Sequence, residues 1–335
     1  MLPDVSVLMP CRNAGDTLEE ALDSVLTQRD VALEVLVVDD GSSDGSAELA
    51  ERIAARHRAL RVLRSPGRGL VAALNHGLGE CAAPLVARMD ADDVCLPGRL
   101  SMQRDALASD PTLQVLGTRV EAFPEAAVAG GLSRYLAWQN ALLSPDAHAA
   151  QLFVEAPLCH PSVMLRRDAL LALGGYRDGP FAEDYDLWLR LDAAGARMAK
   201  LPEVLLRWRQ HPARTTLRDP RYALARFPEL KAPFLARRLQ LTPRPLDLWG
   251  AGPTGKRLAR ELEKHGVRAA RFVDVDPRKI GRTARAAPVV APEALAGPGE
   301  RWVVVAIGAA GARDLTRAYL DARGFREGLD YLCAS

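Results

Sequence analysis

Short apolar runs alternate with stretches of helical periodicity along the first part of the chain. The apolar runs are 5–9, 34–38, 60–63 and 84–89. Runs of this length, bounded by turn-forming residues, predict buried strands. The helical stretches are 17–28, 46–58 and 70–77. Strands that alternate with helices predict an α/β fold built around a parallel sheet.

The first of these helices has a start signal. Thr17 and Glu20 stand three positions apart, which is the spacing of a capping box. In that arrangement the threonine hydroxyl and the glutamate carboxylate satisfy backbone N–H groups of the first turn. We therefore expect the helix to begin at Thr17 with its side chain as the cap.

The pattern continues less regularly after residue 98. A helix is expected over 99–109 and strands over 114–117, 162–165 and 204–208, with another helix from Glu183. The segment 121–156 has poor periodicity. We expect it to be irregular, with some helix.

A second domain is indicated after residue 220. A helical stretch runs over 222–241 with Pro228 and Pro233 inside it, and the proline-rich residues 242–245 follow as a linker. Strands at 246–249, 271–275 and 302–307 then surround a helix at 256–265. The expected organisation is a main domain at 1–220, a helical linker at 221–243 and a small Rossmann-like α/β domain at 244–335.

Composition limits the class of protein. A chain of 335 residues is long enough for two domains, and its net charge of +2 shows no footprint of nucleic-acid binding. The five cysteines are odd in number and scattered, which fits a reducing compartment and argues against disulfides or a zinc site. No signal peptide opens the chain, and no apolar stretch approaches the length of a membrane span. We expect a cytoplasmic protein.

The strand at 84–89 is followed directly by Asp90, Asp92 and Asp93. The carboxyl ends of strands are where open α/β sheets bind ligands. Carboxylates this close repel one another unless a cation lies between them. A hard divalent ion that also binds phosphates fits this chemistry. An isolated Asp-x-Asp is more often a solvated turn, but the other motifs of this chain argue for a metal site.

Several motifs, taken in order, resemble those of the large inverting family 2 of nucleotide-sugar glycosyltransferases. They are Val5-Ser-Val-Leu-Met-Pro, Val37-Val-Asp-Asp-Gly-Ser-Ser-Asp, Gly69-Leu-Val-Ala-Ala-Leu-Asn-His-Gly-Leu, Met89-Asp-Ala-Asp-Asp-Val, Pro97-Gly-Arg-Leu, His160-Pro-Ser-Val-Met-Leu-Arg-Arg, Gly174-Gly-Tyr, Glu183-Asp-Tyr-Asp-Leu-Trp-Leu-Arg and Arg209-Gln-His. The resemblance covers roughly residues 3 to 216. It implies a GT-A fold, in which a nucleotide-binding half precedes an acceptor-binding half.

The resemblance also assigns the nucleotide-sugar side. The expected binding residues are Pro10, Arg12, Asp39, Asp40, Arg68 and Asp90. Asp39 is expected to hold the base or ribose, which a carboxylate at a strand end also does in dinucleotide folds. Asp40 shares that role or only caps the turn, and Arg68 reaches a phosphate or the base or is a surface residue. These alternatives stay open.

Metal binding is assigned to Asp92, with His211 closing the site from the second half. The resemblance implies Mn²⁺ or Mg²⁺, which would neutralise the departing diphosphate as a Lewis acid. Asp90 is expected to contact ribose or sugar, and Asp93 to face the following loop, although the pattern allows the three acids to exchange roles. A lone histidine after a strand is usually structural, and only the resemblance favours a ligand here.

The helix from Glu183 carries the expected catalytic base. Acidic residues in a first turn also serve simply as favourable charges at the helix N-terminus. The resemblance makes Asp184 the base that removes the acceptor hydroxyl proton, with Asp186 as the alternative. His160 and Glu183 are expected on the acceptor side. An inverting transfer needs one base and no covalent sugar–enzyme intermediate.

The small second domain has a glycine turn of its own. Gly250, Gly252 and Gly255 satisfy G-x-G-x-x-G, and Asp274 follows at the spacing of dinucleotide-binding folds. Arg257 stands where a Walker motif needs serine or threonine, which argues against that class of nucleotidase. The turn binds a nucleotide, or it only packs the helix against the strand. Both interpretations remain open.

The expected function is metal-dependent, inverting transfer of a sugar from a nucleoside-diphosphate sugar to an acceptor hydroxyl. The resemblance points to cell-surface polysaccharide or glycolipid synthesis, with a glycan or glycolipid acceptor and peripheral association with the inner face of the membrane. A nucleotidyltransferase and a catalytically silent nucleotide-sugar sensor are the alternatives. Pro10-Cys-Arg-Asn-Ala-Gly does not resemble the glycine- and lysine-rich loop of the first, and the presence of Asp92, Asp184 and His211 argues against the second.

Overall fold

The computed structural model describes residues 2–65, 67–223, 225–309 and 311–335. The chain forms two compact units. The first comprises Met1–His148 and Pro157–Asp219, and the second comprises Ala149–Ala156 and Pro220–Ser335. The second unit thus includes a segment from the middle of the chain as well as the C-terminal part.

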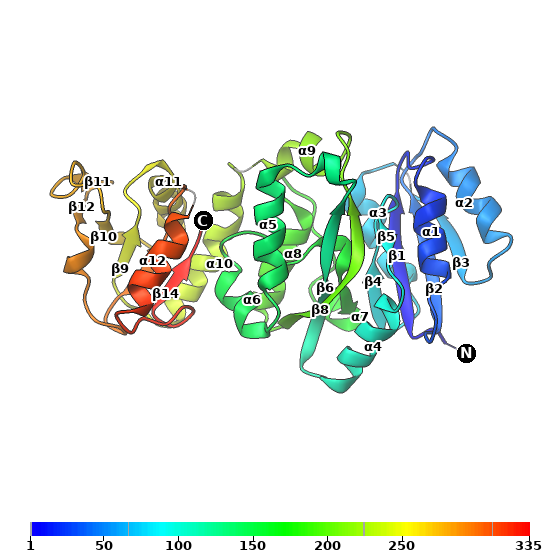
Figure 1. Ribbon diagram of the computed structural model, residues 1–335, viewed down its shortest axis with the longest axis horizontal. Helices are drawn as coiled ribbons and strands as arrows, with labels where there is room; N and C mark the ends of the chain where they lie inside the picture. Colours follow the sequence, from blue (N-terminus) through cyan, green and yellow to red (C-terminus); the bar gives the residue numbers. More distant parts are fainter. Residues whose placement is uncertain (1, 66, 224, 310) are drawn as a thin grey trace. The chain divides into compact units, whose positions relative to one another are not determined.

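The first four strands of the first unit form the parallel sheet that the sequence predicts. They are β1 (Val5–Cys11), β2 (Leu33–Asp39), β3 (Leu60–Arg64) and β4 (Leu85–Arg88), and β1 pairs in parallel with both β2 and β4. The helices between them are α1 (Leu18–Leu26), α2 (Ser46–Ala54) and α3 (Leu70–Glu80). Figure 1 shows these elements in blue to cyan. Parallel pairing brings the carboxyl ends of β1, β2 and β4 to one edge of the sheet.

Four further strands, two of which run antiparallel to the first four, extend this sheet to eight strands in the order β3-β2-β1-β4-β7-β6-β8-β5. The added strands are β5 (Val94–Cys95), β6 (Leu113–Phe123), β7 (Met164–Arg166) and β8 (Arg197–Arg209). Strand β7 is antiparallel to β4 and β6, whereas β6 and β8 run in parallel along the whole of β6. The expected α/β class is confirmed, with a mixed sheet.

The segment 121–156 is more regular than its sequence pattern indicates. Strand β6 continues to Phe123, and α5 (Gly130–Ala141) and α6 (Pro145–Gln151) follow. Helix α5 begins with two glycines and buries only Leu136 and Gln139. Glycine is a poor helix former, and so small an apolar face leaves little periodicity to detect.

The capping-box prediction for Thr17 is wrong. Thr17 does precede α1, but its side chain caps no backbone N–H group of the helix. Its hydroxyl donates instead to the carbonyl of Ala91 at 3.0 Å, and Glu20 pairs with Arg209. Both side chains therefore connect α1 to residues far away in the sequence.

The remaining helices of the first unit are α4 (Arg99–Ser109), α7 (Arg167–Ala172), α8 (Glu183–Ala193) and α9 (Thr215–Arg218). Buried residues of α1, α4 and the strands form one apolar core that includes Leu18, Leu22, Met89 and Leu100. Among the described residues, no helix of either unit is long and apolar enough to cross a membrane.

The second unit is the Rossmann-like α/β domain that the sequence predicts. Its strands are β9 (Leu246–Trp249), β10 (Ala269–Val273), β11 (Thr283–Ala284), β12 (Ala287–Val290), β13 (Trp302–Val305) and β14 (Tyr331–Cys333). Their order is β11-β12-β10-β9-β13-β14, and all pairs except β11 with β12 are parallel. The strand order reverses at β9, as it does in a doubly wound nucleotide-binding sheet.

Helices α10 (Phe227–Leu241), α11 (Pro253–Glu263) and α12 (Ala312–Asp321) complete this unit. Helix α10, expected as part of a linker, packs inside the unit, and Leu224 of the stretch predicted as helical lies outside the described residues. The buried Lys231 ammonium donates to the carbonyls of Phe153 at 2.8 Å and Ala334 at 2.6 Å. This contact joins the 149–156 segment to α10 and the C-terminal end.

Candidate functional site

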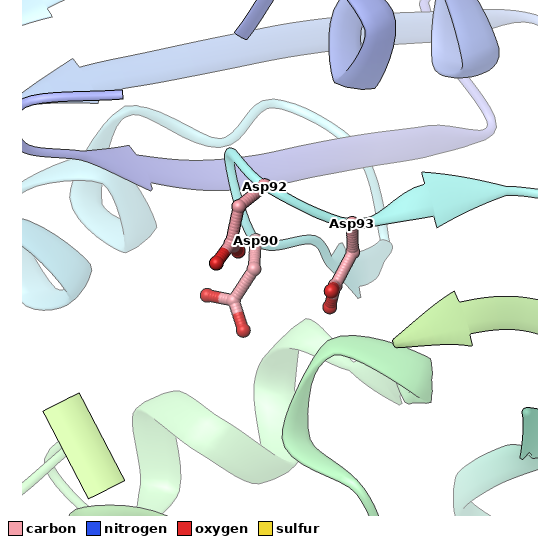
Figure 2. Close-up of side chains that lie close together, drawn as sticks. All are labelled: Asp90, Asp92 and Asp93. Carbon is pink, nitrogen blue, oxygen red and sulfur yellow. The ribbon is translucent and has the colours of Figure 1, made fainter. Parts of the chain in front are cut away.

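Asp90, Asp92 and Asp93 lie in the turn between β4 and β5. One carboxylate oxygen of each lies within 4.8 Å of the others, so the three form a cluster able to hold a metal ion. Figure 2 shows the three side chains pointing to the same side of the turn, with Asp90 and Asp92 next to each other. The structure therefore brings together the acids that the sequence singled out.

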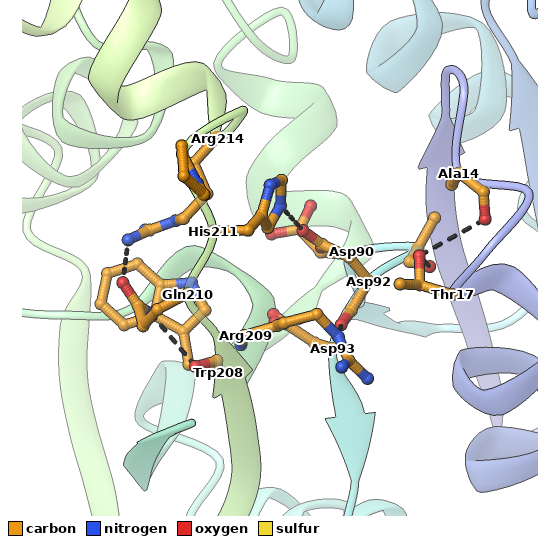
Figure 3. Close-up of polar contacts among 12 residues, drawn as sticks. Ala14, Thr17, Asp90, Asp92, Asp93, Trp208, Arg209, Gln210, His211 and Arg214 are labelled. Atoms are coloured by element: carbon orange, nitrogen blue, oxygen red, sulfur yellow. Dashed lines mark hydrogen bonds and ion pairs between the residues drawn. The ribbon is translucent and has the colours of Figure 1, made fainter. Parts of the chain in front are cut away.

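His211 approaches this cluster from the end of β8. Its Nε2 lies 2.9 Å from Asp92 Oδ2, across a separation of more than a hundred positions in the sequence (Figure 3). Burial and the neighbouring Asp90 charge raise the pKa of Asp92, and the contact with His211 opposes that rise. The two residues expected to bind metal thus lie in direct contact.

Asp93 has a different environment from its neighbours. It is 1% exposed, and its Oδ1 accepts the backbone N–H of Arg209 at 2.8 Å. Burial raises its pKa well above the usual range, and the charges of Asp90 and Asp92 add to that rise. Asp93 therefore holds the end of β8 against the acidic turn.

Arg209 is a site residue that we did not predict. Its Nε donates to the carbonyl of Asp92 at 2.6 Å (Figure 3). Its guanidinium also pairs with Glu20 of α1. Together with the bond from Thr17 to Ala91, these contacts hold the backbone of the acidic turn between α1 and β8. No local signal in the sequence reveals contacts between such distant residues.

The residues around His211 form their own small network. The Arg214 guanidinium stacks over the Trp208 ring at 4.1 Å and donates to the Gln210 side chain. Gln210 in turn donates to the Trp208 carbonyl at 3.1 Å (Figure 3). These contacts fix the turn that carries His211, so the imidazole is held in place beside Asp92.

The expected nucleotide residues lie at the ends of β1 and β2. Cys11 pairs with Asp39 in the strand register, so the loop with Arg12 lies beside the loop with Asp40. Asp39 is 2% exposed, and both of its carboxylate oxygens lie 3.3 Å from the Ser42 backbone N–H. It is thus held at the sheet edge that carries the acidic turn.

Asp40 organises the neighbouring loop. Its carboxylate accepts the Ser65 hydroxyl at 3.1 Å and the Gly69 backbone N–H at 2.9 Å, and Arg12 lies 3.7 Å away. These contacts match the turn-capping alternative for Asp40. Pro10 is buried at the end of β1, whereas the side chains of Arg12 and Arg68 are exposed.

Asp184 lies in the first turn of α8. It accepts the Tyr185 backbone N–H at 2.7 Å and keeps part of its surface exposed. Burial raises its pKa to about 7, and the adjacent Glu183 charge contributes to the rise. A carboxyl group that exchanges its proton near neutral pH has the property that a general base needs.

Asp186, the alternative base, has a structural partner. It is 3% exposed and accepts Arg190 Nε at 2.6 Å, one helical turn further on. Breaking a buried ion pair leaves an uncompensated charge, so this carboxylate is not free for proton transfer. The geometry favours Asp184 over Asp186.

A chain of contacts holds His160 and Glu183 near this helix start. Asn75 of α3 makes two hydrogen bonds with the backbone of Tyr176, at 2.8 and 2.9 Å. The Tyr176 hydroxyl lies 3.1 Å from His160 Nε2, and His160 Nδ1 lies 3.7 Å from Glu183. Burial lowers the pKa of His160. The expected acceptor-side residues are therefore buried and interconnected.

Arg88 is the second residue that we missed. It ends β4, is 2% exposed, and donates to Asp90 Oδ1 at 2.7 Å. A charged residue at the end of an otherwise apolar strand is unusual and could have indicated a functional role, but an analysis of the hydrophobic pattern alone gives it no weight.

The glycine turn of the second unit forms between β9 and α11. Gly250 has φ +122°, and a Cβ there would lie 2.4 Å from the Ala306 carbonyl oxygen. At Gly255 a Cβ would lie 1.9 Å from the Gly250 carbonyl oxygen, whereas at Gly252 it would meet nothing within 4 Å. Asp274 accepts the Ala251 backbone N–H at 2.9 Å and Lys279 at 3.0 Å. Close packing against backbone carbonyls thus explains why glycine is needed at two of these three positions.

The contact between Asn75 and Tyr176 generates a stability prediction. Gly174 and Gly175 both have φ +73°, but only at Gly175 would a Cβ meet Asn75 Oδ1, at 2.5 Å. Gly174→Ala should lower the free energy of unfolding by about 1–2 kcal/mol, the cost of a left-handed alanine. Gly175→Ala should lower it further because Asn75 must move. Chemical unfolding measures both changes, and equal losses would show that the Asn75 contact contributes nothing.

Bacterial proteins with glycosyltransferase names are similar to this chain in sequence. The chain is 33% identical over 214 residues to the Bacillus subtilis protein EpsE, which is assigned as a glycosyltransferase, covering 62% of this chain and 73% of that protein. It is 34% identical over 195 residues to the amylovoran biosynthesis glycosyltransferase AmsE of Erwinia amylovora, covering 58% of this chain and 71% of that protein.

Solved structures share the fold. The mannosyltransferase PcManGT from Pyrobaculum calidifontis, solved with GDP-Man and Mn²⁺, superposes with a TM-score of 0.51 at 23% identity. The superposition covers 78% of this chain and 69% of that one. This likeness shows the GT-A fold that the motifs implied.

The family model of glycosyl transferase family 2 matches residues 6–174, which include the acidic turn, the Asp39 strand end and His160. Together with the relatives, this match establishes the enzyme class. The chain belongs to glycosyl transferase family 2 and is a glycosyltransferase.

Proposed function

We propose that this enzyme transfers a sugar from a nucleoside-diphosphate sugar to an acceptor hydroxyl, with inversion at the sugar carbon and with a divalent metal ion. The observation that carries the proposal is the contact between Asp92 and His211 inside the cluster of carboxylates. Two residues that are far apart in the sequence meet there, at the turn that carries the carboxylates.

The donor set fits Mn²⁺ or Mg²⁺. Carboxylate oxygens suit both ions, and an imidazole nitrogen is a further ligand for a transition metal. The raised pKa values of Asp92 and Asp93, which follow from burial and mutual repulsion, indicate excess negative charge that a cation would relieve. Asp92 and His211 would hold the ion. When bound, it supplies Lewis-acid neutralisation of the diphosphate.

The protein's own residues perform the other tasks. Asp39 orients the base or ribose at the end of β2, and Asp90, held by Arg88, faces the ribose or sugar. Pro10, Arg12 and Arg68 shape the loops beside the nucleotide. Asp184 accepts the proton of the acceptor hydroxyl as that oxygen attacks the sugar carbon opposite the leaving diphosphate.

The setting that the relatives support is the assembly of cell-surface polysaccharide or glycolipid. AmsE, which is 34% identical, is named for amylovoran biosynthesis. We propose a glycan or glycolipid acceptor and action in the cytoplasm at the inner face of the membrane. Membership in the family leaves nucleotidyl transfer without support, and the paired Asp92 and His211 argue against a silent sensor.

A donor screen tests the function. Release of nucleoside diphosphate should depend on the donor and should rise on addition of Mn²⁺ or Mg²⁺. Asp92→Asn should lower the metal-stimulated rate by about 10²-fold or more, because one ligand charge is lost. Asp105→Asn, whose side chain is 64% exposed on α4, is the matched control and should change nothing.

Two results would contradict the assignment. Full turnover in the presence of EDTA would show that the reaction does not require a divalent metal ion. Normal metal stimulation of Asp92→Asn would move the ligand role to another acid of the cluster.

The pH dependence tests the base. Because Asp184 must be unprotonated to accept a proton, and its pKa is about 7, kcat/KM should fall as the pH drops below about 7. Asp184→Asn should lower kcat by about 10²–10⁴-fold and abolish this acid limb. Nucleotide affinity, measured by calorimetry, should stay unchanged.

Asp186→Asn is the contrasting variant. It should lower the melting temperature by weakening the pair with Arg190 while keeping the acid limb. If Asp186→Asn removed the acid limb and Asp184→Asn kept it, the roles of the two residues would have to be exchanged.

Nucleotide binding by the second unit stays a prediction. The open space at Gly252 is compatible with the close approach of a ligand, whereas Gly250 and Gly255 are explained by packing. Thermal-shift titration with NAD, UDP and UDP-sugars should show a shift that Gly252→Ala abolishes without lowering the melting temperature of the free protein. The absence of any shift would leave the turn as a packing device only.

A further inference from the structure

Arg88 is buried with part of its hydrogen-bonding capacity unused. Nη2 donates to Asp90 Oδ1 at 2.7 Å. Nε and Nη1 are also buried, and neither has a hydrogen-bond partner in the described parts of the chain. Buried donors are almost always paired, so an exception of this kind requires a physical explanation.

Arg99 shows what a structural arginine looks like in the same core. It is 1% exposed, and its Nε donates to Gln103 at 3.2 Å. Its Nη1 lies 3.4 Å from the Met89 sulfur, and its Nη2 donates to the Arg88 carbonyl at 2.8 Å. Every nitrogen of this guanidinium has a partner, and the contacts fasten α4 to β4. Arg88 has no such network, so hydrogen bonding does not account for its burial.

The charge of Arg88 reaches both sides of the proposed site. On the acidic turn its Nη2 donates to the Asp90 carboxylate at 2.7 Å. On the α8 side, burial raises the pKa of Asp184 to about 7, the Glu183 charge raises it further, and the Arg88 charge opposes both. The charges that influence the pKa of Asp184 thus come from its own helix and from β4, and Asp184 in turn influences the pKa of the Tyr176 hydroxyl in the segment after α7.

The carboxylates of Glu183 and Asp184 repel each other, and a nearby cation would reduce this repulsion. Two adjacent carboxylates in a largely buried place cannot both stay ionised without a nearby positive charge. The described neighbours of Glu183 include His160, but burial lowers the pKa of that histidine and so disfavours its charged form. Arg88 keeps its charge at every relevant pH.

We propose that Arg88 is a positioning residue for sugar transfer, whose buried guanidinium fixes the Asp90 carboxylate on one side and supplies the positive charge beside Glu183 and Asp184 on the other. The proposal rests on the proposed function, because it takes Asp184 as the base. It explains why a guanidinium with unpaired donors is retained. A buried charge that is costly to the fold persists where the site needs it.

The test compares three variants of the full chain: Arg88→Met, Arg88→Lys and Arg99→Met. Arg88→Met should shift the acid limb of kcat/KM to higher pH by about one unit or more, because the positive charge that stabilises the ionised Asp184 carboxylate is removed. Arg88→Lys keeps a positive charge and should leave the limb close to that of the wild type. Arg88→Met should also lower kcat above the limb, since Asp90 is no longer fixed.

Melting temperatures distinguish a positioning role of Arg88 from a purely structural role. Arg99→Met should lower the melting temperature clearly, because its partners lose their donors. Arg88→Met should melt close to the wild type, since two unpaired buried donors disappear together with the one that is paired. Equal losses of melting temperature in the two methionine variants would identify Arg88 as a structural arginine and overturn the proposal.

The kinetic outcome overturns it independently. If the wild type is active and Arg88→Met has the same acid limb as the wild type, then the Arg88 charge does not act on the base. If instead the wild type released no nucleoside diphosphate with any donor, the proposed function itself would fail. The two failures are therefore distinguishable.

Discussion

Repulsion among three carboxylates in one short turn is the constraint on which the rest of the site depends. Each carboxylate has a partner within the site: Asp90 is held by Arg88 of β4, whereas Asp92 and Asp93 are held by His211 and the Arg209 backbone at the end of β8. The backbone of the turn is held as well, because Thr17 and Arg209 donate to its carbonyls. The cluster therefore exists only when α1, β4 and β8 are all in place. A divalent cation would relieve the repulsion that remains.

Helix α3 connects this nucleotide side to the proposed acceptor side. The helix begins after Gly69, whose backbone N–H is held by Asp40, and Asn75 in its middle binds both backbone groups of Tyr176. Tyr176 then contacts His160, which lies beside Glu183 at the start of α8. A single helix thus fixes the distance between the strand end that carries Asp39 and Asp40 and the helix that carries the proposed base. This arrangement gives a structural role to Gly69 and Asn75 within the motif that begins at Gly69.

The sequence predicted the parts of this account that depend on local patterns. Strand ends, the acidic turn and the first turn of α8 all follow from periodicity and from motifs within a few residues. The sequence did not predict Arg209, because its partners Asp92 and Glu20 are brought near only by the folded sheet. Arg88 was missed for another reason: its partner Asp90 is two residues away, but the apolar pattern gave no weight to a charged residue at the end of a strand. The capping prediction for Thr17 is wrong because of tertiary contacts. Its spacing to Glu20 is correct for a capping box, but Thr17 donates to Ala91 and Glu20 pairs with Arg209 instead of forming the local cap. Helix α5 escaped detection because it buries so little apolar surface.

The central claim is that Asp92 and His211 hold a divalent ion beside the nucleotide diphosphate. The most direct measurement is a crystal structure with a nucleoside diphosphate and Mn²⁺, in which anomalous scattering locates the metal. The account predicts a peak at coordination distance from an Asp92 carboxylate oxygen and from His211 Nε2, with the diphosphate on its open side. A peak bound elsewhere, or a diphosphate bound at this edge of the sheet with no metal beside Asp92, would contradict it.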